Sequence, residues 1–241
     1  TLKICNETRL NNFVFRCRKR MHSGVGESST DDVANVSVVL FYRYFLPSEG
    51  RLPLIQRIPE FYVERLQCFC KQLSEELYLK GRLLIAAEGI NGTLSGETAS
   101  IAWFIKTMEG FDMVKELDLA PSLSRDDVTE ADRHLFWGVD WKLSSTTDRS
   151  LEPFPELTVR VVKEIISTGC QISVQDVLER GGKHLTPTQF HETIRENANV
   201  VLIDVRNTFE HEIGHFVHPD TQASALNPET VTFSSFSNFC D

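Results

Sequence analysis

Apolar residues follow strand-like and helix-like patterns in turn along the first two thirds of the chain. Residues 36–45 are rich in β-branched and aromatic side chains, a composition typical of a buried strand. Residues 60–78 carry apolar side chains at spacings of three and four, which predicts a helix with one buried face, ended by Gly81. The pattern then predicts a strand over 82–87, a turn over 88–92, a returning strand from 93 and a helix over 97–109.

This order of elements lacks one strand of a βαββαβ, ferredoxin-like unit. Two segments are candidates for it, residues 137–143 and 157–162, and we favour the second as the final strand. Residues 144–150 between them are polar and are interpreted as an insertion. We therefore expect an α+β domain over 36–169, preceded by a disordered or targeting segment over 1–35.

A second, α/β unit begins near Thr186. Thr186 followed by Pro187 is a helix-start signature, and we expect that helix to run to about Asn197. Residues 200–204 form a short apolar run that ends in an acid, which is typical of a buried parallel strand. We expect residues 170–185 to be a linker and residues 186–241 to be the first part of a truncated, marginally stable domain.

Composition and charge narrow the class of protein. Hydrophobic residues make up 41% and charged residues 24% of the 241 residues, which are ordinary globular values. The net charge is −9, yet residues 1–26 hold six basic residues and one acidic residue. An acidic body argues against nucleic-acid binding over the whole surface but leaves room for a local basic groove. The basic start is typical either of an organelle-targeting segment or of a solvated tail.

The six cysteines favour a reducing compartment. They are scattered without metal-ligand spacing, and no secretory or membrane-spanning apolar run is present. We expect a cytoplasmic or organellar protein that is not secreted and has no membrane contact, metal or cofactor. The string from His211 to His215 formally fits HExxH, but Gly214 inside it argues against a zinc-binding helix.

A polar pattern follows the predicted strand of the second unit. Asp204 stands where that strand meets a loop, Arg206 is able to pair with Asp204 or Glu210, and Gly214 is expected to permit a tight turn. We interpret the set as an ion-pair and turn network that shapes the site. Its members are Asp204, Arg206, Asn207, Glu210 and His215.

The first unit offers candidate RNA contacts. Guanidinium groups bind phosphates and strand aromatics stack on bases, which makes Tyr42, Tyr44 and Phe45 candidates for stacking. The candidate polar contacts are Arg43, Arg82, Glu88 and Asn91. In the alternative interpretation the aromatics are core residues, the arginines are solvated and Asn91 is a turn residue.

Four motifs occur in an order that resembles a known family. They are Phe41-Tyr-Arg-Tyr-Phe45, Gly81-Arg-Leu-Leu-Ile-Ala-Ala-Glu-Gly-Ile-Asn-Gly-Thr-Leu-Ser-Gly96, Val159-Arg-Val-Val-Lys-Glu-Ile-Ile-Ser-Thr-Gly169 and Ile203-Asp-Val-Arg-Asn207. The chain is similar over about residues 36–239 to the rhodanese-type tRNA uridine hydroxylases and their eukaryotic relatives, the thiosulfate sulfurtransferase/rhodanese-like domain-containing proteins. The resemblance implies an acylphosphatase-like (ferredoxin-like) domain followed by a rhodanese domain, with tRNA as partner.

The resemblance implies two chemistries, oxygen-dependent hydroxylation of the wobble uridine at carbon five and sulfur transfer through a cysteine persulfide. Both need a cysteine in a loop resembling Cys-x-Gly-Gly-x-Arg-Cys, whose amides stabilise the thiolate. This sequence has no such loop, because only Asp241 follows Cys240. We therefore expect no catalytic residue in this chain and no activity from it alone. Three hypotheses stay open: a hydroxylase when full length, a sulfurtransferase, or a non-catalytic module that binds RNA or protein.

Overall fold

The computed structural model describes residues 35–45, 61–117, 128–167, 179–197, 199–232, 235–236 and 239. It divides into unit 1, which ends at Ile165, and unit 2, which begins at Ile166. The predictions for residues 1–34, for 170–178 of the linker and for Cys240 lie outside the described residues.

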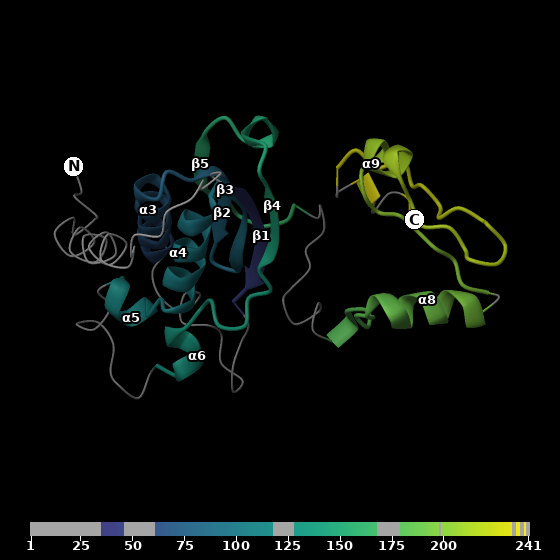
Figure 1. Ribbon diagram of the computed structural model, residues 1–241. Helices are drawn as coiled ribbons and strands as arrows, with labels where there is room; N and C mark the ends of the chain where they lie inside the picture. Colours follow the sequence, from purple (N-terminus) through teal and green to yellow (C-terminus); the bar gives the residue numbers. More distant parts are fainter. Residues whose placement is uncertain are drawn as a thin grey trace. The chain divides into compact units, whose positions relative to one another are not determined.

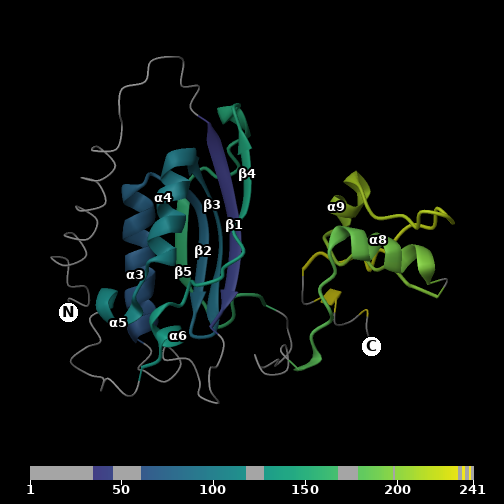
Figure 2. The ribbon, with the colours of Figure 1, turned by 60° about the horizontal axis from the view of Figure 1, so that its bottom comes forward.

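Unit 1 is a five-stranded sheet with helices on one face (Figures 1 and 2). Its elements are β1 (Val36–Tyr44), α3 (Phe61–Glu76), β2 (Lys80–Ala86), β3 (Gly89–Glu97), α4 (Thr98–Glu109), α5 (Met113–Glu116), α6 (Glu130–Arg133), β4 (Lys142–Thr146), the 3₁₀ turn η3 (Arg149–Leu151) and β5 (Leu157–Val161). The strand order is β4-β1-β3-β2-β5. Only the pairing of β2 with β5 is parallel. The first four strands in this order form the ferredoxin-like arrangement that the sequence predicts.

The strand that closes this arrangement is β4, so the prediction that residues 157–162 do so is wrong. β4 pairs antiparallel with β1 at the edge of the sheet, whereas β5 adds a further strand outside β2. Residues 142–145 are exposed, so β4 has no apolar alternation and part of it resembles a polar insertion in the sequence. A hydrogen bond of 2.8 Å joins the hydroxyls of Ser37 on β1 and Ser145 on β4.

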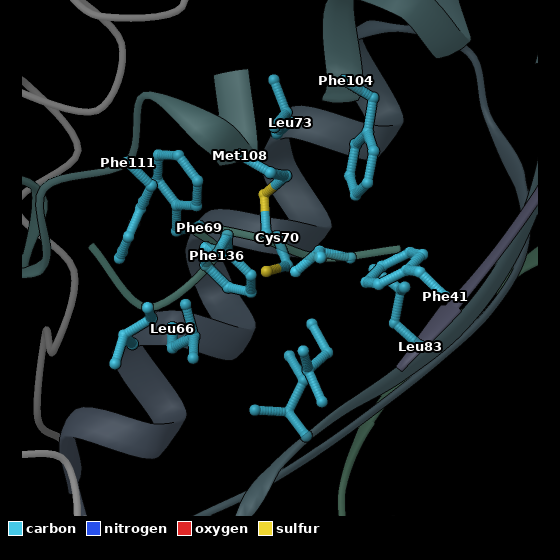
Figure 3. Packing of buried hydrophobic residues seen from close by; sticks show 14 of the residues in the cluster. Phe41, Leu66, Phe69, Cys70, Leu73, Leu83, Phe104, Met108, Phe111 and Phe136 are labelled. Atoms are coloured by element: carbon cyan, nitrogen blue, oxygen red, sulfur yellow. The ribbon is translucent and has the colours of Figure 1, made fainter. Parts of the chain in front are cut away.

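The core of unit 1 lies between the sheet and two helices. α3 packs on β2 and β5, and α4 packs on β1 and β3. Figure 3 shows rings and branched side chains from both layers converging between them. The largest fully buried side chains are Phe41, Phe69, Phe104, Phe111, Phe136, Leu66, Leu73, Leu83, Ile85 and Ile90. Burying one such side chain contributes about 1.5–3 kcal/mol, so this single interface dominates the stability of the unit.

The end of α3 differs from the prediction. Tyr78, not Gly81, takes the left-handed backbone (φ 55°) that ends the helix, and the Leu79 amide donates to the Ser74 carbonyl at 2.9 Å. Gly81 lies inside β2 instead, with φ 127°. A Cβ at Gly81 would lie 2.1 Å from the Thr93 carbonyl oxygen on β3, so this close strand contact requires glycine.

Within the described residues of unit 2, the helices with defined bounds are α8 (Pro187–Glu196) and α9 (Thr208–Ile213). The predicted cap of the first is confirmed, because Thr186 Oγ1 accepts the Gln189 amide at 3.3 Å and Gln189 Oε1 accepts the Thr186 amide at 3.0 Å. The predicted buried strand over 200–204 is wrong. Ile203 forms one isolated parallel bridge with Leu226, and Val201 is 66% exposed. A buried parallel strand needs partners on both edges and cover on both faces, which the described part of unit 2 does not supply.

Gly81→Ala tests the close strand contact. We expect it to lower the free energy of unfolding of unit 1 by about 2–4 kcal/mol, because the backbone is strained and the methyl group overlaps Thr93. Urea unfolding followed by tryptophan fluorescence measures this, since all three tryptophans, Trp103, Trp137 and Trp141, lie in unit 1. Gly110→Ala is the control, because its methyl group would meet nothing nearer than 3.4 Å. Equal unfolding midpoints for the two variants would contradict the assignment.

Candidate functional site

The sheet of unit 1 has a face that α3 and α4 do not cover. Side chains alternate along β1, so that Val39 and Phe41 are buried under the helices while Leu40 and Tyr42 are 47% and 58% exposed. We call the side that carries Leu40 and Tyr42 the open face. An exposed aromatic ring on a strand with neighbours on both sides is unusual, because such positions are generally covered by another layer.

The strand register fixes which residues share the open face. Leu40 pairs with Thr93 of β3, and Thr93 pairs with Arg82 of β2. Lys142 of β4 lies beside Leu40 in this first row. In the next row, Tyr42 is followed across β3, β2 and β5 by Asn91, Leu84 and Arg160.

The four predicted polar contacts lie in different surroundings in the structure. Arg82 is exposed on the open face, as an RNA contact requires. Arg43 has the parity of Phe41 and Phe45 and lies on the helix-covered side, where it is partly buried. Burial lowers the pKa of the Arg43 guanidinium from its ordinary value, yet the group stays charged near neutral pH.

Glu88 and Asn91 fasten the chain that follows β5. A carboxylate oxygen of Glu88 accepts the Ile165 amide at 2.7 Å, and Asn91 Nδ2 donates to the Ile165 carbonyl at 3.1 Å. Asn91 lies within β3, so the alternative that it is a turn residue is wrong. Both polar side chains therefore hold the segment that follows β5 in place.

The three aromatic candidates differ in how far their rings are exposed. Phe45 is a core residue, 2% exposed, and its ring meets Phe136 edge to face at 6.2 Å. Tyr44 is partly buried, and burial raises the pKa of its phenol, with the charges of Glu88 and Glu164 adding to the effect. Tyr42 alone of the three presents a largely free ring. Sequence reasoning missed Arg160 and Lys142, because their place on this face depends on the pairing of β5 and β4.

In unit 2 the five predicted site-shaping residues lie in and around α9. The guanidinium of Arg206 donates from Nε to one oxygen of Asp204 at 2.8 Å and from Nη2 to the other at 2.6 Å. Asn207 and Glu210 form the capping box of α9, so Glu210 is not the partner of Arg206. Asp204 is buried, and the Arg206 hydrogen bonds hold the pKa of its carboxyl well below its ordinary value.

Two histidines complete this network. His211 Nδ1 lies 3.2 Å from Asp204, and His215 Nδ1 donates to the His211 carbonyl at 2.9 Å, while the two rings stack at 4.0 Å. Arg206 Nη2 also donates to the Gly214 carbonyl at 2.5 Å. Gly214 has extended backbone (φ 176°), so the expected glycine-dependent turn there is wrong. Among the described residues no group of three or more His, Cys, Asp or Glu side chains is placed to hold a metal ion.

The two described cysteines of unit 1 differ in exposure, since Cys68 is partly buried and Cys70 is buried. Cys70 is fully buried between α3 and the sheet (Figure 3), and burial raises the pKa of its thiol, which keeps the sulfur neutral and inert. Within the described ranges, no helix is long and apolar enough to cross a membrane.

Unit 1 is thus an α+β domain of the ferredoxin-like class with one added strand. One face of its sheet is left open by α3 and α4, and the buried Ile165 packs over part of that face, at Gly89 and Asn91. A family profile, the UPF0176 acylphosphatase-like domain, matches residues 36–165, which is more than half of the chain. The chain belongs to this family.

Several curated relatives extend the similarity beyond unit 1. The chain is 32% identical over 203 residues to a protein of Streptococcus pyogenes serotype M6 and 30% identical over 203 residues to one of Acholeplasma laidlawii. It is 28% identical over 197 residues to one of Enterococcus faecalis. Each is named tRNA uridine(34) hydroxylase. The matches cover 80–83% of this chain, and the chain spans about half the length of these relatives.

Asp204→Asn tests the network of unit 2. Because the folded pKa of Asp204 is depressed, its contribution to stability is complete above about pH 4 and is lost as the pH falls further. We expect the Asp204 and Leu226 amides to exchange roughly ten-fold faster in the variant at pH 7. The difference from the unmodified chain is expected to shrink toward pH 2.

Hydrogen exchange at each pH checks this prediction. Asp220→Asn is the matched control, because Asp220 is an exposed residue of unit 2 outside the network. A difference between the unmodified chain and Asp204→Asn that stays constant from pH 7 to pH 2 would contradict the role of the carboxylate charge.

Proposed function

We propose that this protein modifies tRNA by hydroxylating uridine 34. The observation that carries the proposal is the extent of the match to relatives of that name. It covers at least 80% of the chain, more than the 165 residues of unit 1, and so it includes part of unit 2. Similarity through two units supports a common function better than similarity through one widely used fold.

The two units take different parts in this proposal. The open face of unit 1, with Arg82 exposed on it, supports a role in holding the RNA. In unit 2 the contacts of Asp204, Arg206 and the capping box of α9 support a role as the beginning of a rhodanese domain, in which these residues shape a site rather than react. We place no reacting group on the described residues.

Sulfur transfer is not favoured as the reaction. The relatives are named for hydroxylation. Hydroxylation replaces the hydrogen on carbon five of uridine by a hydroxyl group. With molecular oxygen, the oxidant that the family resemblance implies, one oxygen atom enters the product and the other is reduced to water by an external two-electron donor. A tRNA substrate agrees with a cytoplasmic or organellar location.

Deletion of the gene that encodes this chain tests the proposal. We expect mass spectrometry of nucleosides from total tRNA to show loss of 5-hydroxyuridine and of nucleosides derived from it. Reintroduction of the gene restores them, while unrelated modifications such as pseudouridine serve as the internal control. An unchanged amount of 5-hydroxyuridine in the deletion strain would rule out hydroxylation as the function. A fall in thiolated uridine instead would favour sulfur transfer.

A further inference from the structure

The open face of unit 1 combines a free aromatic ring with positive charge. Tyr42 lies on β1, the second strand of five, with its ring 58% exposed, and Leu40 lies one row away on the same strand. Strand spacing places the backbones of Arg82 and Arg160 roughly 10–15 Å from that of Tyr42 on this face. This spacing suits a ligand that is longer than one small molecule and flat in at least one part.

The two guanidinium groups on this face are not neutralised by the protein. Arg82 and Arg160 are exposed, and within the described part of the chain neither pairs with a carboxylate. The lysines differ from them. Lys80 pairs with Glu152 at 2.7 Å, and Lys142 pairs with Asp140.

Two of the acids around this face have partners within the protein. Glu152 binds Lys80 and accepts from Ser95, and Glu88 accepts the Ile165 amide. Glu164 is exposed, and its charge acts on Tyr44 of β1. The chain has a net charge of −9, but the two unpaired arginines beside an exposed ring give this face local positive charge. That charge is complementary to an anionic ligand.

We propose that the open face is a stacking platform for single-stranded RNA. One base lies flat on the Tyr42 ring, Leu40 contacts the neighbouring nucleotide, and Arg82 and Arg160 bind backbone phosphates. The inference rests on the proposed function, because it takes the RNA to be the single-stranded loop of tRNA that carries uridine 34. Sheet surfaces with exposed aromatics take unpaired bases in this way, whereas a peptide generally adds along a sheet edge.

Fluorescence anisotropy of the purified chain with a labelled single-stranded RNA of about ten nucleotides tests the platform. We expect Tyr42→Ala to weaken binding about 5- to 100-fold, because base stacking on an aromatic ring is worth that much. Tyr42→Phe keeps the ring and is expected to bind within about two-fold of the unmodified chain. Tyr78→Ala is the matched control, since Tyr78 is 80% exposed at the end of α3, away from the open face.

The arginines are tested through the salt dependence of the same binding. Arg82→Ala and Arg160→Ala are each expected to lower the slope of log affinity against log salt by about one. Arg195→Ala, an exposed arginine of α8 in unit 2, is expected to leave the slope unchanged. An RNA duplex of the same length is expected to bind more weakly than the single strand, because its bases are not free to stack.

The outcomes separate the platform from the proposed function. Absence of RNA binding, equal affinity of Tyr42→Ala and the unmodified chain, or equal loss in Tyr42→Phe and Tyr42→Ala would overturn the platform. Equal binding of heparin and RNA, both insensitive to Tyr42, would show simple charge attraction and would also overturn it. None of these results affects the nucleoside measurement, which tests hydroxylation alone. Tryptophan fluorescence confirms that each variant of unit 1 is folded.

Discussion

The packing of α3 and α4 against one face of the five-stranded sheet is the interaction on which unit 1 depends. Both helices bury their apolar stripes on the same side, where Phe41, Leu83 and Ile90 supply one residue from each of three neighbouring strands. Because successive side chains of a strand point to opposite faces of the sheet, each core residue of β1, β3 and β2 has neighbours whose side chains point to the other face. The composition of the open face is therefore set together with that of the core.

This constraint explains why the open face carries functional information. A residue there is not needed for the helix–sheet core, so its chemistry is free to serve a ligand. Tyr42 follows the buried Phe41, and Arg82 precedes the buried Leu83. Fastening of the segment after β5 by Glu88 and Asn91 keeps the β2–β3 turn and the added strand together, which holds Arg160 in line with Tyr42.

Much of unit 1 was predictable because its helices and inner strands have strong apolar periodicity. The closing strand β4 was not, because an exposed edge strand with Leu143 58% exposed carries no burial pattern. The left-handed residue at the end of α3 was missed for another reason. Tyrosine is not the residue that this conformation favours, and the helix tolerates it where its side chain is solvated.

The candidate site was predictable only in part. Their residue types made Arg82 and Tyr42 candidates. Adjacent residues of a strand face opposite sides of the sheet, so Arg43 lies under the helices and Tyr42 does not. Arg160 joins the face through a parallel pairing between β2 and β5, which no local pattern reveals. In unit 2 the cap of α8 at Thr186 was recognisable, whereas the strand over 200–204 required partners that a local apolar run does not guarantee.

Photo-crosslinking with peptide mapping shows whether the face that α3 and α4 leave open binds RNA. The purified chain is irradiated with a single-stranded RNA that contains 4-thiouridine, and the crosslinked peptides are identified by mass spectrometry. The account predicts that the principal crosslink lies on Tyr42 or another residue of β1, with weaker ones on β2 and β5. Crosslinks confined to α3, α4 or unit 2 would contradict it.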